Sequence, residues 1–244
     1  MRKIFFVILF ALFAVSAEAQ DIKFSAKAGY NIGGNAPLGM PASIRRLDKF
    51  GLKPNWMLGI EMEKMFNEKW GLTAGIRFEN KGMMTDAKVK GYKMEMTQGG
   101  ETLDGYFTGF VETNVLQWML TFPVQAAYNI NDRTRLRLGA YASLLVSRDF
   151  FGFAYDGYIR KGDPTGPKVI LGNDEESRGK YCFKDDMRSF QIGVAGGFDM
   201  KVWKKIGFFA DINFGVTPLF NSDFKVMDFE MYPVFATLGV SYGF

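Results

Sequence analysis

The sequence predicts an all-β protein, an eight-stranded antiparallel up-and-down transmembrane β-barrel with long loops at one end and short turns at the other. Two observations lead to this fold class. Apolar residues recur at every second position in eight separate segments, which is the period of a strand with one apolar and one polar face. The connections between the segments alternate between very short and long, as in outer-membrane barrels, whose turns face the periplasm and whose loops face outside.

The last predicted strand, residues 232–244, has the clearest alternation and ends on an aromatic residue. Its apolar face consists of Val234, Ala236, Leu238, Val240, Tyr242 and Phe244. A strand at the end of the chain either remains an exposed edge, which invites aggregation, or pairs with the first strand. We therefore expect it to pair with the first predicted strand, residues 22–32, and to close the barrel.

Six more strands are predicted between these two, at 56–65, 72–79, 116–129, 135–146, 190–201 and 208–216. Short turns are expected at 66–69, 131–133 and 203–205, and long loops at 33–55 and 149–188. Residues 81–98 and 101–112 continue the alternation more weakly around Gly99 and Gly100, which predicts a hairpin that projects beyond the barrel. Pro123 removes a backbone donor from its strand and predicts a local bulge or a missing hydrogen bond.

Residues 1–19 have the pattern of a secretory signal peptide. Arg2 and Lys3 precede an apolar run from Ile4, and Ala17 and Ala19 fit a small-residue cleavage site. The run is too short to span a bilayer as a helix, and no later segment has the eighteen or so consecutive apolar residues of a transmembrane helix. We therefore expect a mature barrel domain of residues 20–244.

The composition excludes several classes of protein. Without residues 1–19 the formal net charge of +4 becomes +3, because two basic residues and one acidic residue are removed. A small surplus of Lys and Arg that is not gathered in a run indicates no nucleic-acid partner. Because Cys182 is the one cysteine, a scaffold of intramolecular disulfides is excluded. A soluble secreted barrel with a ligand inside and an outer-membrane barrel both remain open.

The aromatic residues favour the membrane. Trp70 and Tyr128 lie at the short-turn end of the apolar faces, and Tyr30 and Trp118 lie near the opposite end. Two rings of aromatic residues around an aliphatic band are typical of the two membrane interfaces. A soluble barrel has no physical reason for this sorting, so the apolar faces are expected to contact lipid.

The opposite faces of the strands then line the lumen. They carry Lys23, Lys27, Arg77, Arg135, Arg137 and Lys201 together with Glu61, Glu63, Glu79, Asp199 and Asp211. Side chains fill the interior of an eight-stranded barrel, and these opposite charges can nearly neutralise one another. We expect a packed ion-pair network and not an open pore.

At this point the sequence resembles a known family. The tract 114–118 leading to Phe122, Pro123 and Val124, the element 156–158 and the terminal 242–244 look like PorT-like outer-membrane β-barrel proteins, which are common in Bacteroidota. The resemblance implies an eight-stranded barrel in the bacterial outer membrane, and one member is an accessory of a protein-secretion system. It also implies that barrel-assembly machinery reads the terminal Leu238, Val240, Tyr242 and Phe244. The family offers no catalytic residues.

The chain contains no histidine, the side chain that most often serves as a general base near neutral pH. Catalysis by the carboxylates Glu61, Glu63 and Asp211 is the alternative, but Arg and Lys beside them stabilise their charge and make them poor bases. The acidic tract around Asp174 lacks the spacing of a calcium-binding loop and is interpreted as a solvated loop. Cys182 has no neighbouring His or second Cys that would make it reactive.

The methionines at 83, 84, 94 and 96 have two interpretations, an adaptable contact surface or the filling of the projecting hairpin. Altogether the sequence predicts a non-enzymatic barrel, without cofactor or metal, that contacts outer-membrane lipid and binds a protein partner or ligand through its external loops. The alternatives are an accessory subunit of a secretion or envelope-assembly system and a soluble ligand-binding barrel.

Overall fold

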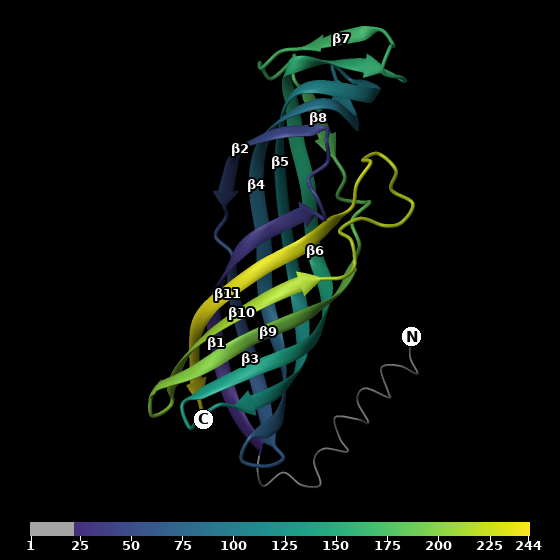
Figure 1. Ribbon diagram of the computed structural model, residues 1–244. Coiled ribbons are helices and arrows are strands. Elements are labelled where there is room, and N and C mark those ends of the chain that lie inside the picture. The colour runs from purple at the N-terminus through teal and green to yellow at the C-terminus, as the bar shows by residue number, and fades with distance from the viewer. Residues whose placement is uncertain (1–21) are drawn as a thin grey trace.

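The computed structural model describes residues 22–244, which form one antiparallel sheet closed into a ring (Figure 1). Each strand of the ring pairs with the next, and the last pairs with the first, which confirms the predicted fold class. The predicted signal peptide, 1–19, lies outside the described residues. In ring order the eight strands are β1 (Ile22–Pro37), β3 (Trp56–Met65), β4 (Trp70–Gln98), β5 (Glu101–Asn129), β6 (Thr134–Lys161), β9 (Phe190–Trp203), β10 (Ile206–Gly215) and β11 (Met231–Gly243).

The closure of the ring follows the predicted pairing of the first and last strands. β11 pairs with β1 from Gly243 opposite Ser25 to Met231 opposite Pro37. Beyond the ladder, the backbone N–H of Phe244 donates to the carbonyl of Phe24 at 3.0 Å. The barrel therefore has no open strand edge at the short-turn end. An open edge would leave backbone donors and acceptors unpaired, and this favours closure.

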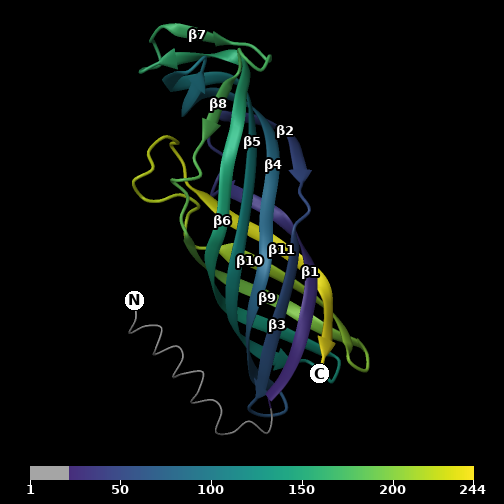
Figure 2. The same cartoon turned by 180° about the vertical axis from the view of Figure 1, so that it is seen from behind.

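Three strands continue far beyond the ring and form a projection at the long-loop end (Figures 1 and 2). β4 and β5 have 29 residues each and β6 has 28. The predicted hairpin is confirmed, since β4 and β5 pair up to Gln98 and Glu101. We use "projection" for β4 from 83, β5 up to 115 and β6 from 150, with the segments that pack on them.

The predicted long loops at 33–55 and 149–188 are largely wrong, because both contain strands. β1 continues to Pro37, and β2 (Ile44–Leu52) pairs with β4. β6 continues to Lys161, and β7 (Lys168–Leu171) and β8 (Gly179–Cys182) pair with it. The long hairpin leaves backbone donors and acceptors unpaired at its two edges, so neighbouring segments that pair with these edges are stabilised. The sequence patterns of these short strands are too weak to reveal this.

The projection has a hydrophobic core of its own. The concave faces of β4, β5 and β6 are covered by residues 172–189 and 216–230, from which Phe183, Met187, Leu219 and Phe220 are buried. Met83, Met94 and Met96 are buried in the same core, so for these three the interpretation as a contact surface is wrong and the filling role is confirmed. Buried side chains from this core include Val89, Leu103, Phe107, Val111, Phe150, Ile159 and Tyr181.

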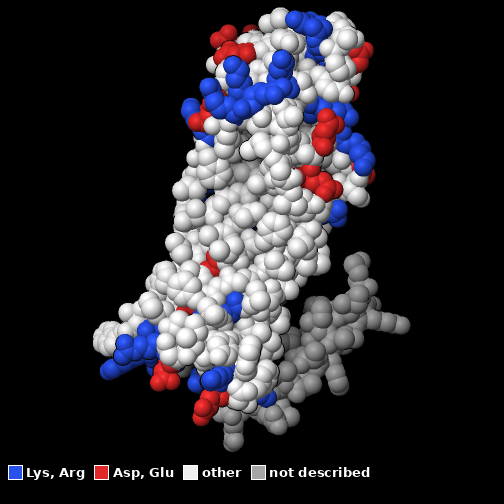
Figure 3. Space-filling model, viewed as in Figure 1, with Lys and Arg blue, Asp and Glu red and all other residues white. Residues whose placement is uncertain are grey.

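The barrel wall is apolar outside and charged inside. Leu138 and Ile212, on the outer face, are 70% and 65% exposed, whereas Arg77 and Asp211, on the inner face, are buried. On the face drawn in Figure 3, a largely uncharged band separates charged groups at the two ends. This distribution excludes the soluble ligand-binding barrel, which would hide its apolar faces in the lumen. Within residues 22–244, no helix has the length and hydropathy to cross a membrane.

Pro123 lies where the pairing of β4 with β5 is interrupted, as its missing backbone donor predicts. The β4–β5 ladder pairs Ala74 with Val124 and Arg77 with Thr121, but no pairs form between these two. The register is the same on both sides of the interruption, so the strand loses hydrogen bonds without a bulge.

Candidate functional site

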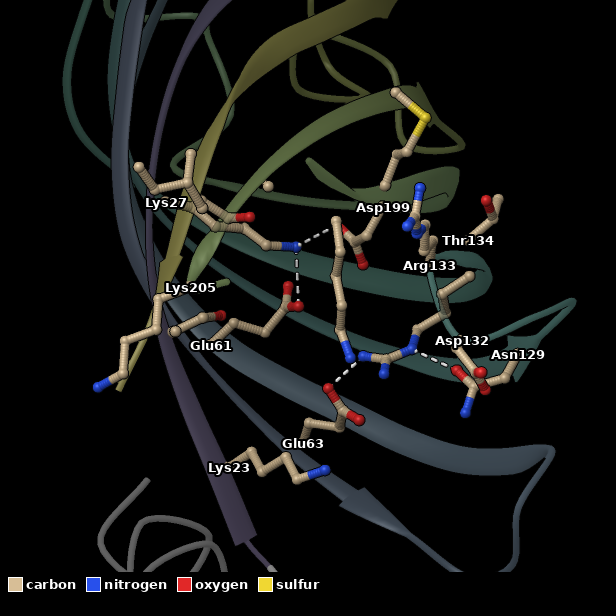
Figure 4. A pocket seen from close by; sticks show the side chains of 18 of the residues that line it. Lys23, Lys27, Glu61, Glu63, Asn129, Asp132, Arg133, Thr134, Asp199 and Lys205 are labelled. Carbon is tan, nitrogen blue, oxygen red and sulfur yellow. Dashed lines mark hydrogen bonds and ion pairs between the residues drawn. The ribbon is translucent and has the colours of Figure 1, made fainter. Parts of the chain in front are cut away.

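Charged side chains from six strands meet in the lumen and form one cluster. Arg137 of β6 lies at its centre, since its Nε lies 2.7 Å from Asp199 Oδ2 of β9 and one of its terminal nitrogens lies 2.6 Å from Asp211 Oδ1 of β10. Lys27 of β1 extends between Glu61 of β3 at 2.8 Å and Asp199 at 3.0 Å (Figure 4).

Arg77 of β4 completes this cluster. It contacts Asp211 at 2.9 Å and Glu61 at 3.5 Å. The cluster thus contains three cations and three carboxylates, so its charges cancel. Charges removed from water are tolerated when each is paired and hydrogen-bonded, as they are here. Because the cluster draws on six strands around the ring, its ion pairs link distant parts of the barrel wall.

Two glycines provide the room for this cluster. A Cβ at Gly197 would lie 2.0 Å from Asp211 Oδ1 and 2.3 Å from the carbonyl oxygen of Ala210. A Cβ at Gly59 would lie 2.9 Å from Arg77 Cγ. The backbone must approach closely at these positions for the charged side chains to meet.

A second buried pair lies above the cluster. Lys81 Nζ contacts Glu79 Oε1 at 3.0 Å, and both side chains are buried. The same carboxylate accepts hydrogen bonds from Thr121 at 2.6 Å and from Asn31 at 3.1 Å. The Lys81 ammonium also lies 5.5 Å from the ring centroids of Tyr141 and Phe235. Lys81 is therefore held by both a carboxylate and aromatic faces.

The periplasmic mouth of the barrel is an open vestibule of about 380 Å³ (Figure 4). Arg135 forms an ion pair with Glu63 there and donates to Asn129 Oδ1 at 2.9 Å. Seven basic and four acidic residues line the vestibule, so positive charge is in excess. The basic residues are Lys23, Lys27, Arg133, Arg135, Lys201, Lys204 and Lys205.

The predicted network is thus divided into separate groups. Glu61, Arg77, Arg137, Asp199 and Asp211 meet in the cluster, Glu79 lies apart with Lys81, and Glu63 pairs with Arg135 at the mouth. The prediction is wrong for Lys201. It is exposed at the rim, and the ion pairs described within residues 22–244 do not include it.

The aromatic residues form two groups on the outer face. Trp118 packs edge-on against Trp56 with ring centroids 5.1 Å apart, and the Tyr30 hydroxyl donates to the Lys53 carbonyl at 2.6 Å. At the short-turn end, the rings of Trp70 and Tyr128 are 4.8 Å apart. Leu238, Val240 and Tyr242 are exposed on the outer face of β11, and Phe244, directly after this strand, is exposed too.

Sequence reasoning missed three lumen residues that matter. Lys81 was assigned to the projecting hairpin, although it follows Glu79 by two positions and therefore shares its inward face. That spacing could have identified it. Thr121 and Asn31 lie on inward faces too, but uncharged polar residues gave no signal that distinguished them from other lumen positions.

In the projection, burial raises the pKa of the Tyr181 hydroxyl well above its ordinary value. This hydroxyl donates to the Glu112 carbonyl at 2.7 Å and lies 2.7 Å from the Thr113 hydroxyl. Tyr181 stays neutral at physiological pH and ties β8 to β5.

Comparison with known proteins agrees with this architecture. The outer membrane protein beta-barrel domain family matches residues 18–221 of the chain. Among solved structures, the chain is similar to Ail, the attachment invasion locus protein of Yersinia pestis, which was solved in complex with the heparin analogue sucrose octasulfate. The TM-score is 0.42 and the sequence identity is 13%, and the match covers 92% of this chain and 100% of that one.

It is also similar to Neisserial surface protein A, with a TM-score of 0.34, 12% identity and coverage of 91% and 97% of the two chains. No curated protein matches the chain significantly. Since the family match spans most of the sequence, the chain belongs to the outer membrane protein beta-barrel domain family and is a β-barrel protein of the bacterial outer membrane.

Proposed function

We propose that this chain is a non-enzymatic barrel that binds a partner at the cell surface through its projection, while its own side chains plug its lumen. The observation that carries this proposal is the projection itself, a sheet of three long strands with its own buried core. A barrel needs only short connections for closure. The strands below are enclosed by lipid and by packed charges, so the projection is the surface that is free to bind.

A strand edge at the far end of the projection is available for a protein partner. Within the described residues, β7 pairs with β6 only, so no strand pairs with its second edge, although Gln98 Nε2 donates to the Ile170 carbonyl at 3.4 Å. Ile170 on this strand is 70% exposed. Open edges bind extended peptides by strand addition. We therefore propose a protein segment as the partner.

A second candidate function is that of an accessory subunit of a secretion or envelope-assembly system, as the PorT-like resemblance implies. The observation that favours it is the vestibule, whose excess of positive charge faces the periplasm. An acidic segment of a periplasmic protein would be attracted there. The two candidates place the partner on opposite sides of the membrane.

A photo-crosslinking amino acid in living cells distinguishes the two. It replaces Ile170 on the projection, Lys205 in the periplasmic turn or, as a control for random contacts, the lipid-facing Leu138. The proposal expects a discrete adduct from position 170 that is absent from position 138. Adducts from position 205 alone would refute the surface partner in favour of the periplasmic one, and adducts from neither position would refute both.

Two further expectations belong to the same proposal, one about conductance through the lumen and one about assembly of the barrel. The plugged lumen predicts no large stable conductance in planar bilayers, and a reproducible channel of porin size would refute it. We also propose that the barrel-assembly machinery reads the exposed face formed by Leu238, Val240, Tyr242 and Phe244, because this face alternates regularly and is apolar and aromatic throughout.

A further inference from the structure

The barrel wall is interrupted by a window between β1 and β2, just above the outer group of aromatic residues. The ladder of β1 with β3 ends at Tyr30 opposite Trp56, followed by one hydrogen bond from the Asn31 N–H to the Asn55 carbonyl at 2.9 Å, and above this point the strand partner of β1 is β11. β2 pairs only with β4 among the described strands, as its position at the edge of the projection shows (Figure 2). Two unpaired strand edges therefore face each other.

An apolar cavity of about 240 Å³ lies at this window. Its lining includes residues from both faces of β1, since Asn35 points to the inside of the sheet while Gly34 and Ala36 point to the outside. The cavity therefore lies along the unpaired edge of β1. Apolar side chains of β4, β5 and β11 line the rest of it, among them Met83, Ala87, Val89, Val111, Met231 and Val234.

The side chains of β2 fill the space in front of them only in part, because the Phe50 ring packs on Gly34 of β1, where an added Cβ would lie 3.3 Å from it, while the cavity remains beside Leu47. Two β-bulges, at Ile44/Arg46 and Leu47/Lys49, bring Ile44, Leu47 and Phe50 opposite the inward-facing Val89, Ala87 and Thr85 of β4. Leu47 and Phe50 are nonetheless 48% and 47% exposed. Apolar residues that point inward and remain half exposed indicate a place for an apolar ligand.

One polar side chain in this cavity has no partner. Asn35 is 4% exposed, and neither its Oδ1 nor its Nδ2 has a hydrogen-bond partner within the described residues. Its backbone N–H donates only to the sulfur of Met83 at 3.2 Å, and a thioether is a weak acceptor. An unsatisfied buried amide is costly, so a ligand group that accepts and donates hydrogen bonds would stabilise the site.

From these observations we infer that the window is a binding site for a single-chain amphiphile, whose acyl chain fills the cavity and whose carboxylic acid or amide head contacts Asn35. A dry cavity of roughly 150 Å³ accommodates benzene, so the larger volume here admits one chain but not a lipid with several chains. Met40, in the connection between β1 and β2, lines the cavity and is exposed, so the cavity can be reached from outside the barrel. This site is separate from the protein partner proposed above.

Binding of dodecanoic acid to the purified protein in lipid nanodiscs tests the inference. The probe is expected to bind saturably and at least tenfold more tightly than dodecyltrimethylammonium, which has the same chain but a head that neither donates to nor accepts from an amide. This comparison needs no variant. Equal binding of the two probes would overturn the inference, and binding in detergent but not in nanodiscs would identify a membrane lipid chain as the occupant and overturn the free amphiphile.

Two variants test whether the probe binds in this cavity. Ala87→Phe fills the cavity and is expected to weaken binding at least tenfold, and Asn35→Leu is expected to weaken it roughly tenfold, the loss typical of one hydrogen bond. Gln191→Leu is the matched control, because Gln191 is also buried in the lumen with an unpartnered amide nitrogen but does not line the cavity. Unchanged binding in Ala87→Phe, with the folded protein verified by its heat-modifiable mobility, would overturn the assignment.

Discussion

Replacing Arg137 with methionine tests whether the lumen cluster holds the barrel together. Arg137 is 2% exposed, and besides its contacts with Asp199 and Asp211 it donates to Gln125 Oε1 at 2.7 Å. Without it, Asp211 keeps only Arg77 and Asp199 keeps only Lys27, and the neutral cluster acquires a net negative charge. Breaking a buried pair by removing one partner costs about 3–5 kcal/mol of unfolding free energy.

Urea unfolding of the protein refolded into phospholipid vesicles, followed by tryptophan fluorescence, measures this cost. With a denaturant slope of about 2 kcal/mol per molar urea, the midpoint is expected to fall by about 2 M. Arg46→Met is the matched control. The Arg46 side chain is 66% exposed and pairs with Asp48 at the surface, so its loss is expected to leave the urea midpoint nearly unchanged.

The double variant Arg137→Met with Asp211→Asn separates charge from packing. If the unpaired charge causes the loss, removing one carboxylate restores part of the stability. The reasoning is refuted if Arg137→Met costs no more than Arg46→Met, or if the double variant is less stable than Arg137→Met alone.

Three further predictions concern other parts of the molecule. Gly197→Ala should destabilise the barrel strongly, because the new Cβ meets Asp211. Gly196→Ala should be tolerated, because the nearest atom to its new Cβ is a side-chain atom of Leu138 at 3.4 Å. Equal melting temperatures of the two variants in a heat-modifiability assay would contradict the close approach at Gly197. Phe150→Ala should lower the free energy of unfolding of the projection by about 3–5 kcal/mol. Residues 162–189 should then become accessible to protease while the barrel stays inserted in the membrane. Unchanged proteolysis would contradict a core that unfolds cooperatively. Deletion of Phe244 should leave the protein degraded or in the periplasm, and normal levels of inserted protein would contradict its role in assembly.

The alternation along the chain determined the barrel, because each strand in a membrane must place apolar side chains toward lipid at a period of two. Residues 56–65 are predicted with the bounds of β3, and the final strand differs from β11 by one residue at each end. The same alternation assigned Glu61, Arg77, Arg137, Asp199 and Asp211 to the inner face. The sequence could not pair them, because an ion pair between strands depends on their register around the ring.

Only the tertiary structure decided what happens above the membrane. Residues 44–52 show an apolar residue at every third position, a spacing that predicts no regular strand, and two bulges against β4 are needed to bring Ile44, Leu47 and Phe50 to one face. Similarly, the sequence of residues 216–230 resembles that of an ordinary loop, whereas the structure buries Leu219 and Phe220 in the core of the projection. The structure of such segments is fixed by the edges and the concave face of the long hairpin, which lie far away in the sequence.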